Sequence, residues 1–177
     1  MIKKKDMKHL PTPYTILLNT TPKSHLKAYA MLNYLPTTGV VFTLSRPADN
    51  LRQILNKQYT KANIVFVDAI SKRVGYNKSS TRDLYIDSPE DLTQISIALE
   101  KVLKALKGKD SFLIVDSLSK LTFYHKQNSL FQFMNVLVNQ CRATNTKLVI
   151  LGIEEDLPQN LRDNIEEMCD RVIQMKG

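Results

Sequence analysis

The chain lacks the residue patterns that mark metal-binding, secreted or membrane-spanning proteins. It has two cysteines, and neither has a second cysteine at the spacing of a metal site, so we expect both thiols to be reduced and partly buried. No apolar run approaches the roughly 20 residues that a membrane-spanning helix needs. Residues 1–10 are basic but lack the apolar stretch of a signal peptide. These absences predict a cytoplasmic protein that does not bind a membrane.

Acidic residues are scarce in two segments, and these segments carry the net charge of +8. Residues 1–27 contain six lysines and one aspartate, and residues 72–82 contain four cations and no acid. The rest of the chain is close to neutral. This distribution permits an anionic partner without requiring one.

The apolar content of 43% is enough for an ordinary core, and apolar runs alternate with helix-period segments. This alternation predicts a three-layer α/β domain with a mostly parallel sheet over residues 13–177, preceded by a basic N-terminal arm over residues 1–12. Residues 70–86 interrupt the alternation as a long basic loop, in which 84–86 suit a short strand. The expected strands are 14–19, 40–45, 64–68, 112–116, 147–152 and 171–175, and the expected helices are 22–34, 47–59, 89–107, 129–144 and 158–168.

The apolar run at residues 112–115 ends in Asp116 and Ser117. A run this apolar predicts a strand buried on both faces, near the centre of a parallel sheet. Since burying an unpaired carboxylate costs several kcal/mol, we expect Asp116 at the exposed carboxyl end of that strand. In open α/β sheets ligands bind at this end, and in P-loop NTPases an aspartate there orders Mg²⁺.

Glycine is missing from the loop after the first strand. A phosphate-binding loop reads G-x-x-x-x-G-K-[ST], and its glycines let backbone N–H groups wrap the phosphates. Lys23 and Ser24 can stand for the last pair, but Asn19 and Pro22 occupy the glycine positions, and Pro22 has no N–H to donate. Three interpretations stay open: a plain helix start with Thr21 as N-cap, an altered anion site, or an intact phosphate cradle.

Taken together, these motifs resemble the RecA-like ATPases of the KaiC/RadA type, particularly archaeal KaiC-like proteins. The resemblance spans most of the chain and rests on the apolar run with Asp116-Ser117-Leu118-Ser119 and on the closing Asp170-Arg171-Val172-Ile173. It implies a RecA-like αβα fold, with Asp116 at the metal-ordering position for Mg²⁺ and ATP. The residues that would contact a nucleotide are Thr20, Thr21, Lys23, Ser24, His25, Asp116 and Ser117.

The chain departs from this family at the end of the second strand. There the family carries a glutamate that polarises the attacking water, whereas this chain has Ser45 and Arg46. Neither side chain can replace a carboxylate base at neutral pH, so we assign no catalytic residue and expect no bound cofactor. In this interpretation Asp116 is a remnant that hydrogen-bonds the loop after Asn19.

Three functions follow as expectations. The first is a degenerate KaiC-like domain that does not hydrolyse ATP and acts as a regulatory or scaffolding module, joining itself or an active relative. The second is a nucleotide-binding or active ATPase with a rearranged phosphate loop. The third is a nucleic-acid-binding module, because cations surround Tyr76 in a mix that suits single strands. Its possible contacts are Lys72, Arg73, Lys78 and Arg82.

Overall fold

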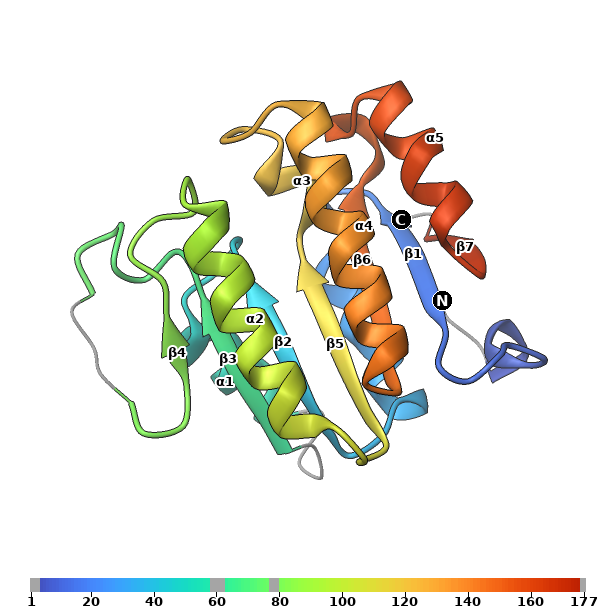
Figure 1. Ribbon diagram of the computed structural model, residues 1–177, viewed down its shortest axis with the longest axis horizontal. Helices are drawn as coiled ribbons and strands as arrows, with labels where there is room; N and C mark the ends of the chain where they lie inside the picture. Colours follow the sequence, from blue (N-terminus) through green and yellow to red (C-terminus); the bar gives the residue numbers. More distant parts are fainter. Residues whose placement is uncertain (1–3, 58–62, 77–79, 176–177) are drawn as a thin grey trace.

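The computed structural model describes residues 4–57, 63–76 and 80–175, and these residues form one α/β domain around a seven-stranded sheet (Figure 1). The strand order is β4-β3-β2-β5-β6-β1-β7, and every described pairing is parallel. The predicted α/β class with a mostly parallel sheet is therefore confirmed. The strands are β1 (Thr15–Thr20), β2 (Thr38–Thr43), β3 (Asn63–Asp68), β4 (Leu84–Tyr85), β5 (Ser111–Asp116), β6 (Thr146–Ile153) and β7 (Arg171–Gln174).

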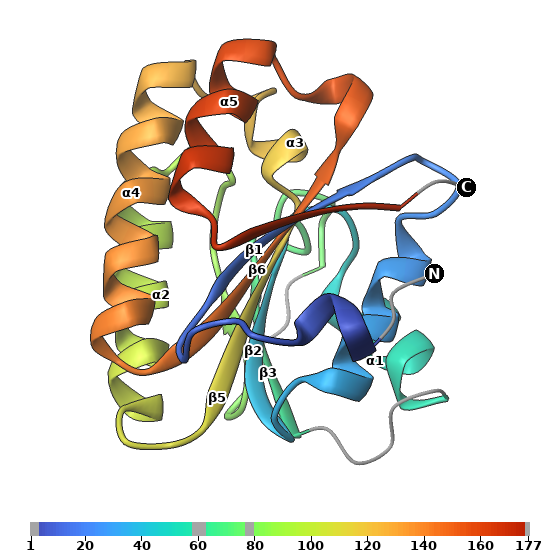
Figure 2. The ribbon, with the colours of Figure 1, turned by 90° about the vertical axis from the view of Figure 1, so that its right-hand side faces the viewer.

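Helices cover both faces of the sheet, as Figure 2 shows in a view along its edge. The α-helices are α1 (Ala48–Asn56), α2 (Leu92–Leu106), α3 (Leu118–Leu121), α4 (Gln127–Ala143) and α5 (Gln159–Met168). The described residues also form the 3₁₀ helices η1 (Lys4–Met7), η2 (Leu26–Tyr34) and η3 (Glu154–Asp156).

The sheet separates two apolar cores. On one face α2, α3, α4 and α5 pack on side chains such as Leu113 and Ile150, and on the other face η2 and α1 pack on side chains such as Ile114 and Phe66. This division follows from the strand period of two, which sends successive side chains to opposite faces. The predicted buried central strand is confirmed, because all six residues of β5 are buried between β2 and β6.

Helix boundaries differ from the predicted ranges where a local cap sets them. Helix α2 begins at Leu92 instead of residue 89, because the Asp91 side chain accepts a hydrogen bond from the Gln94 N–H at 2.8 Å. Helix α4 begins at Gln127, two residues before the predicted start, and the short α3 was not predicted. The segment predicted as a helix over 22–34 becomes helical only at Leu26 and is a 3₁₀ helix.

The N-terminal arm lies against the domain in its described part. Met7 and Leu10 pack against the core beneath η2, and an Arg171 N–H donates to the Asp6 carbonyl at 2.8 Å.

Candidate functional site

The carboxyl ends of β1, β2, β3 and β5 meet at one edge of the sheet, where the sequence predicts a ligand site. Thr43 at the end of β2 is paired in register with Asp68 on one side and with Asp116 on the other. Strand alternation places both carboxylates on the face that carries η2 and α1. The edge is therefore built around two aspartates at the same level of the sheet.

Asp116 is buried, with 1% of its surface exposed, and both of its carboxylate oxygens have partners. Oδ1 lies 2.7 Å from Nε2 of His25, and Oδ2 accepts a hydrogen bond from the Tyr29 hydroxyl at 2.6 Å. Both partners come from the segment after β1, so the expected hydrogen bonding of Asp116 to the loop beyond Asn19 is confirmed.

His25 bridges Asp116 to the end of β1. Its Nδ1 lies 3.0 Å from the Thr20 hydroxyl, which donates its single proton to the Gly152 carbonyl at 3.0 Å. His25 Nε2 and Asp116 Oδ1 thus form a buried hydrogen-bonded pair, and the same ring contacts Thr20 through Nδ1.

This environment shifts the ionisation of both groups that meet at Oδ2. Burial alone would raise the pKa of Asp116, but the hydrogen bond and charge of His25, with the Tyr29 hydroxyl, hold that pKa below its usual value. Burial and the neighbouring carboxylate raise the pKa of Tyr29 well above 10. The site thus keeps a carboxylate anion and a neutral phenol.

The loop between β1 and η2 is a turn closed by two side chains. Thr21 Oγ1 accepts from the Ser24 N–H at 3.2 Å, and Ser24 Oγ accepts from the Thr21 N–H at 2.9 Å, in the reciprocal pattern of a capping box. The expected helix start with Thr21 as N-cap is wrong in position, because η2 begins only at Leu26 and has His25 at its N-cap. Ser24 is fully buried, and its hydroxyl also contacts the Met175 carbonyl. Lys23 is exposed and makes no ion pair within the described part of the chain.

The structure thus brings together some of the predicted nucleotide contacts and separates others. Thr20, His25 and Asp116 form one network, while Thr21 and Ser24 satisfy each other. Ser117 is buried and its hydroxyl lies 3.0 Å from that of Ser119.

The end of β2 carries no acidic side chain. The Thr43 hydroxyl donates to the Arg46 carbonyl at 2.7 Å and closes the turn that leads into α1. Arg46 is exposed, and the Leu44 N–H donates to the Asp116 carbonyl at 2.7 Å. The position of the family's water-polarising glutamate is therefore part of a tight turn.

Two residues of this edge escaped the sequence interpretation. Tyr29 lies four residues after His25, so both can face the sheet from one side of a helical segment, and this spacing was the available signal. Asp68 is fully buried and accepts from the N–H groups of Ala48, Ile70 and Ser71 and from the Ser71 hydroxyl, at 2.6–2.9 Å. Its signal was an apolar run at 64–67 that ends in aspartate.

The cations of the basic loop are engaged by neighbours where the structure describes them. Lys72 pairs with Asp87, and Arg73 pairs with Glu90 at 2.6 Å and lies over the Tyr124 ring. Arg82 donates to the Asn63 side chain at 2.6 Å. Lys78, the fourth predicted contact, lies outside the described residues.

Among the described residues no group of three or more histidine, cysteine or acidic side chains is placed to hold a metal ion. No helix in the described ranges is long and apolar enough to cross a bilayer.

Comparison with solved structures defines the fold. An uncharacterized protein, PH0321, of Pyrococcus horikoshii, solved in complex with an unknown peptide, matches with a TM-score of 0.67 at 14% identity over 97% of this chain and 81% of its own. The flagellar accessory protein FlaH of Methanocaldococcus jannaschii has a TM-score of 0.55 at 16% identity, covering 98% and 77%. A further solved structure, an ATPase domain, has a TM-score of 0.56 at 11% identity, covering 93% and 70%.

These similarities show a KaiC- and RecA-like P-loop NTPase fold, as the sequence predicts. At these identities they show the fold alone. Residues 34–175 match a family described as a family of unknown function, DUF7504. No functionally curated protein matches the chain significantly.

Proposed function

The chain belongs to the family of unknown function DUF7504, and we propose that its KaiC-like domain does not hydrolyse ATP and acts as a regulatory or scaffolding module through protein contacts. The observation that carries this proposal is the state of Asp116. Both oxygens of this carboxylate are occupied by His25 and Tyr29 in a buried network. A carboxylate that orders Mg²⁺ and its waters needs at least one accessible oxygen.

The loop after β1 supports the same proposal. Binding a triphosphate through backbone N–H groups requires donors that face outward. Here the Thr21 and Ser24 N–H groups donate within their own turn, and Pro22 has no N–H. Without such a cradle, and with Ser45 and Arg46 in place of the glutamate, both binding and water activation lose their usual groups.

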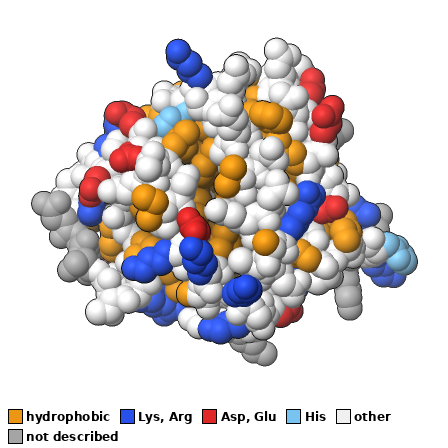
Figure 3. Space-filling model, viewed as in Figure 1, with side chains coloured by type: hydrophobic (Ala, Val, Ile, Leu, Met, Phe, Trp, Pro, Cys, Tyr) orange, Lys and Arg blue, Asp and Glu red, His pale blue; other side chains and the backbone are white. Residues whose placement is uncertain are grey.

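Two observations support a protein partner. Ile97 on α2 and Val136 on α4 are 63% and 55% exposed, and apolar side chains gather over these helices on the face in Figure 3. Exposed apolar side chains that cluster on a surface are typical of interaction sites. In addition, the structurally similar PH0321 was solved in complex with an unknown peptide. We propose a second copy of this chain or an active RecA-like relative as the partner.

Titrating the full chain with Mg-ATP by calorimetry, with phosphate release followed in parallel, tests the lack of hydrolysis. We expect neither micromolar binding heat nor phosphate release above a buffer control. Micromolar binding with turnover that Asp116→Ala abolishes would overturn the proposal in favour of an ATPase with a rearranged phosphate loop. Since Asp116→Ala can also impair folding, Lys23→Ala is the second variant. Lys23 is exposed, so lost turnover in this variant would identify a phosphate-contacting lysine.

Single-stranded nucleic acid is the second candidate partner, because Tyr76 is 52% exposed beside the basic loop. Anisotropy with a labelled oligonucleotide tests it. If the loop contacts phosphates, the logarithm of the affinity should fall by about 0.7 for each tenfold increase in salt and for each phosphate contacted. The ion pairs of Lys72 and Arg73 reduce the number of cations available to bind phosphates. Absence of oligonucleotide binding at about 50 mM salt would remove this candidate.

A further inference from the structure

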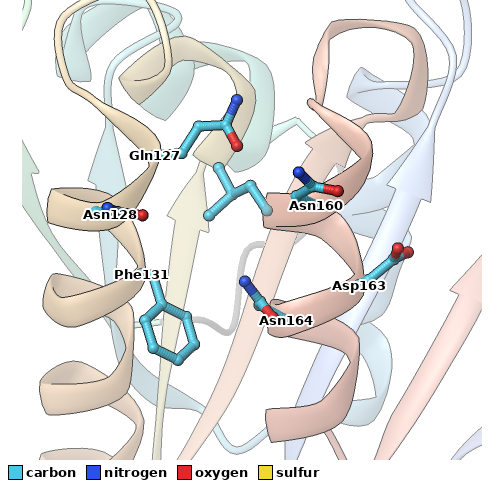
Figure 4. A pocket seen from close by; sticks show the side chains of 7 residues that line it. Gln127, Asn128, Phe131, Asn160, Asp163 and Asn164 are labelled. Carbon is cyan, nitrogen blue, oxygen red and sulfur yellow. The ribbon is translucent and has the colours of Figure 1, made fainter.

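A pocket lies between the amino-terminal halves of α4 and α5, on the opposite face of the sheet from His25 and Tyr29. This pocket has a volume of about 420 Å³, within the usual range for ligand sites. Figure 4 shows side chains from the two helices lining it from opposite sides. The lining residues are Gln127, Asn128, Phe131, Asn160, Leu161, Asp163 and Asn164.

Four of these seven side chains are carboxamides, and each carries two N–H donors and a carbonyl acceptor. All four residues are exposed, and within the described part of the chain none of their side chains makes a hydrogen bond. This contrasts with Asn139, whose amide is bonded to Asn135 one turn away on α4. The pocket therefore presents a set of free donors and acceptors around an apolar floor of Leu161 and Phe131.

From this arrangement we infer that the pocket between α4 and α5 binds an extended segment of a partner protein through its main chain. The inference builds on the proposed protein-interaction role and names a surface and a partner type for it. A peptide main chain needs a donor and an acceptor for each residue, which carboxamides supply together.

The spacing of the amides fits an extended chain. Asn160 and Asn164 are four residues apart on α5, which corresponds to about 6 Å along the helix axis. Two residues of an extended strand span about 6.6 Å. The two amides can thus meet every second residue of a strand that runs along the helix. In Figure 4 Asn164 points toward α4 and Phe131, so the intervening side chain of the ligand can rest on the apolar floor.

The charge of this region favours a basic segment. Asp163 is the one charged residue of the lining, and its Oδ1 accepts from Gln159 at 2.7 Å while Oδ2 has no partner among the described residues. Residues 154–170 contain seven acidic residues and one arginine. A lysine or arginine beside an apolar residue is therefore the expected ligand pattern.

Selection of random seven-residue peptides displayed on phage against the full chain, followed by fluorescence anisotropy with the enriched peptide, tests the inference. Enriched peptides should carry a cation and an apolar residue. The double variant Asn160→Leu/Asn164→Leu should weaken binding about tenfold or more, because each lost hydrogen bond corresponds to about 2- to 12-fold. Asn50→Leu on α1 is the matched control and should stay within about twofold, since Asn50 is an exposed amide on the opposite face of the sheet.

The charge contribution is tested separately. Asp163→Asn should lower the affinity for a basic peptide by about 2- to 5-fold and reduce the salt dependence of its binding. Asp156→Asn is its control, because Asp156 is exposed in η3 outside the pocket.

Equal affinity in the double variant and in Asn50→Leu would overturn the inference, as would enrichment of acidic peptides. Sugar or nucleotide binding that depends on Asn160 and Asn164, without peptide binding, would also overturn it. Phosphate release from Mg-ATP is measured on the same preparations. Turnover would contradict the proposed absence of hydrolysis and leave the peptide result intact, whereas failure of the peptide test leaves the ATP result intact.

Discussion

Asp68 and Asp116 occupy equivalent places on either side of Thr43, yet they are stabilised in different ways. Asp68 accepts three hydrogen bonds from backbone N–H groups and one from a hydroxyl, all from the start of α1 and the turn after β3. Asp116 is held by two side chains, His25 and Tyr29, which lie 91 and 87 residues away in the sequence. The first carboxylate organises a turn, and the second joins two distant segments.

This difference determines what substitution can replace. Side chains can be exchanged for apolar ones of similar size, so a buried polar cluster made of side chains is replaceable as a unit. Backbone N–H groups remain whatever the sequence, and leaving them buried without an acceptor costs free energy. The Asp116 carboxylate is therefore held by side-chain partners that substitution can remove. The Asp68 carboxylate is held mainly by backbone N–H groups that substitution cannot remove.

The largest expected effect is that of Asp68→Ala. It removes the acceptor of four donors, so we expect the free energy of unfolding to fall by about 4 kcal/mol or more. Urea denaturation followed by circular dichroism measures it. No substitution of a partner should rescue this variant, and a loss below about 1 kcal/mol would show that water satisfies these donors.

Asp116→Leu should cost about 3–5 kcal/mol, because it leaves the His25 ring and the Tyr29 hydroxyl buried without their acceptor. Adding His25→Leu and Tyr29→Phe should recover most of that loss, since the apolar triple variant buries no unpaired group. Denaturation curves of the single and triple variants test this. A triple variant as unstable as the single one would show that apolar side chains cannot replace Asp116, His25 and Tyr29 together.

Tyr29→Phe should cost about 1–3 kcal/mol, because it leaves Oδ2 of Asp116 without a donor in a buried site. Tyr34→Phe provides the matched control, because Tyr34 is half-buried and its hydroxyl has no hydrogen bond among the described residues. Its free energy of unfolding should be close to that of the native chain. Equal effects of the two substitutions would mean that the Tyr29 hydroxyl contributes packing only.

The smallest expected effect is that of low pH on the contribution of Asp116 to the free energy of unfolding. The folded-state pKa of Asp116 lies below its usual value of 3.8, so ionised Asp116 stabilises the fold fully above about pH 4. This contribution is lost as pH falls through the folded-state pKa. The stability difference between the native chain and Asp116→Asn should therefore shrink as pH falls below about 4. If this stability difference instead grew as pH fell, the folded-state pKa of Asp116 would lie above its usual value, contrary to the expected direction.

The two aspartates also show what could be predicted from sequence. The apolar run before Asp116 was enough to predict the central strand, its buried faces and a carboxylate at its carboxyl end, because strand burial depends on local composition. The expected exposure of Asp116 was wrong, because His25 and Tyr29 cover its carboxylate and leave it 1% exposed. Thr21 and Pro22 predicted a helix start, but the structure has a turn there and a helix only from Leu26. Local chemistry sufficed for the strand and not for the helix boundary.

The loop that contacts Asp116 was expected, but the individual side chains were not, because tertiary folding brings them from the other side of β6. Lys23 was expected to contact a nucleotide, but the turn closed by Thr21 and Ser24 leaves Lys23 exposed and His25 directed at the carboxylate. The amide-lined pocket was also missed, since its residues are separated by a whole strand and share no motif.

The position of β1 has a consequence for synthesis. This first strand pairs with β6 and β7, the last two strands of the sheet. On a ribosome, β1 has no neighbour to join until residues beyond 146 have emerged, whereas β2, β3 and β5 can already assemble. The nascent chain must therefore carry an unpaired apolar strand through most of translation, which exposes it to aggregation and to chaperones. Closure of the His25–Asp116 pair, which needs β1 docked, is then among the last events of folding.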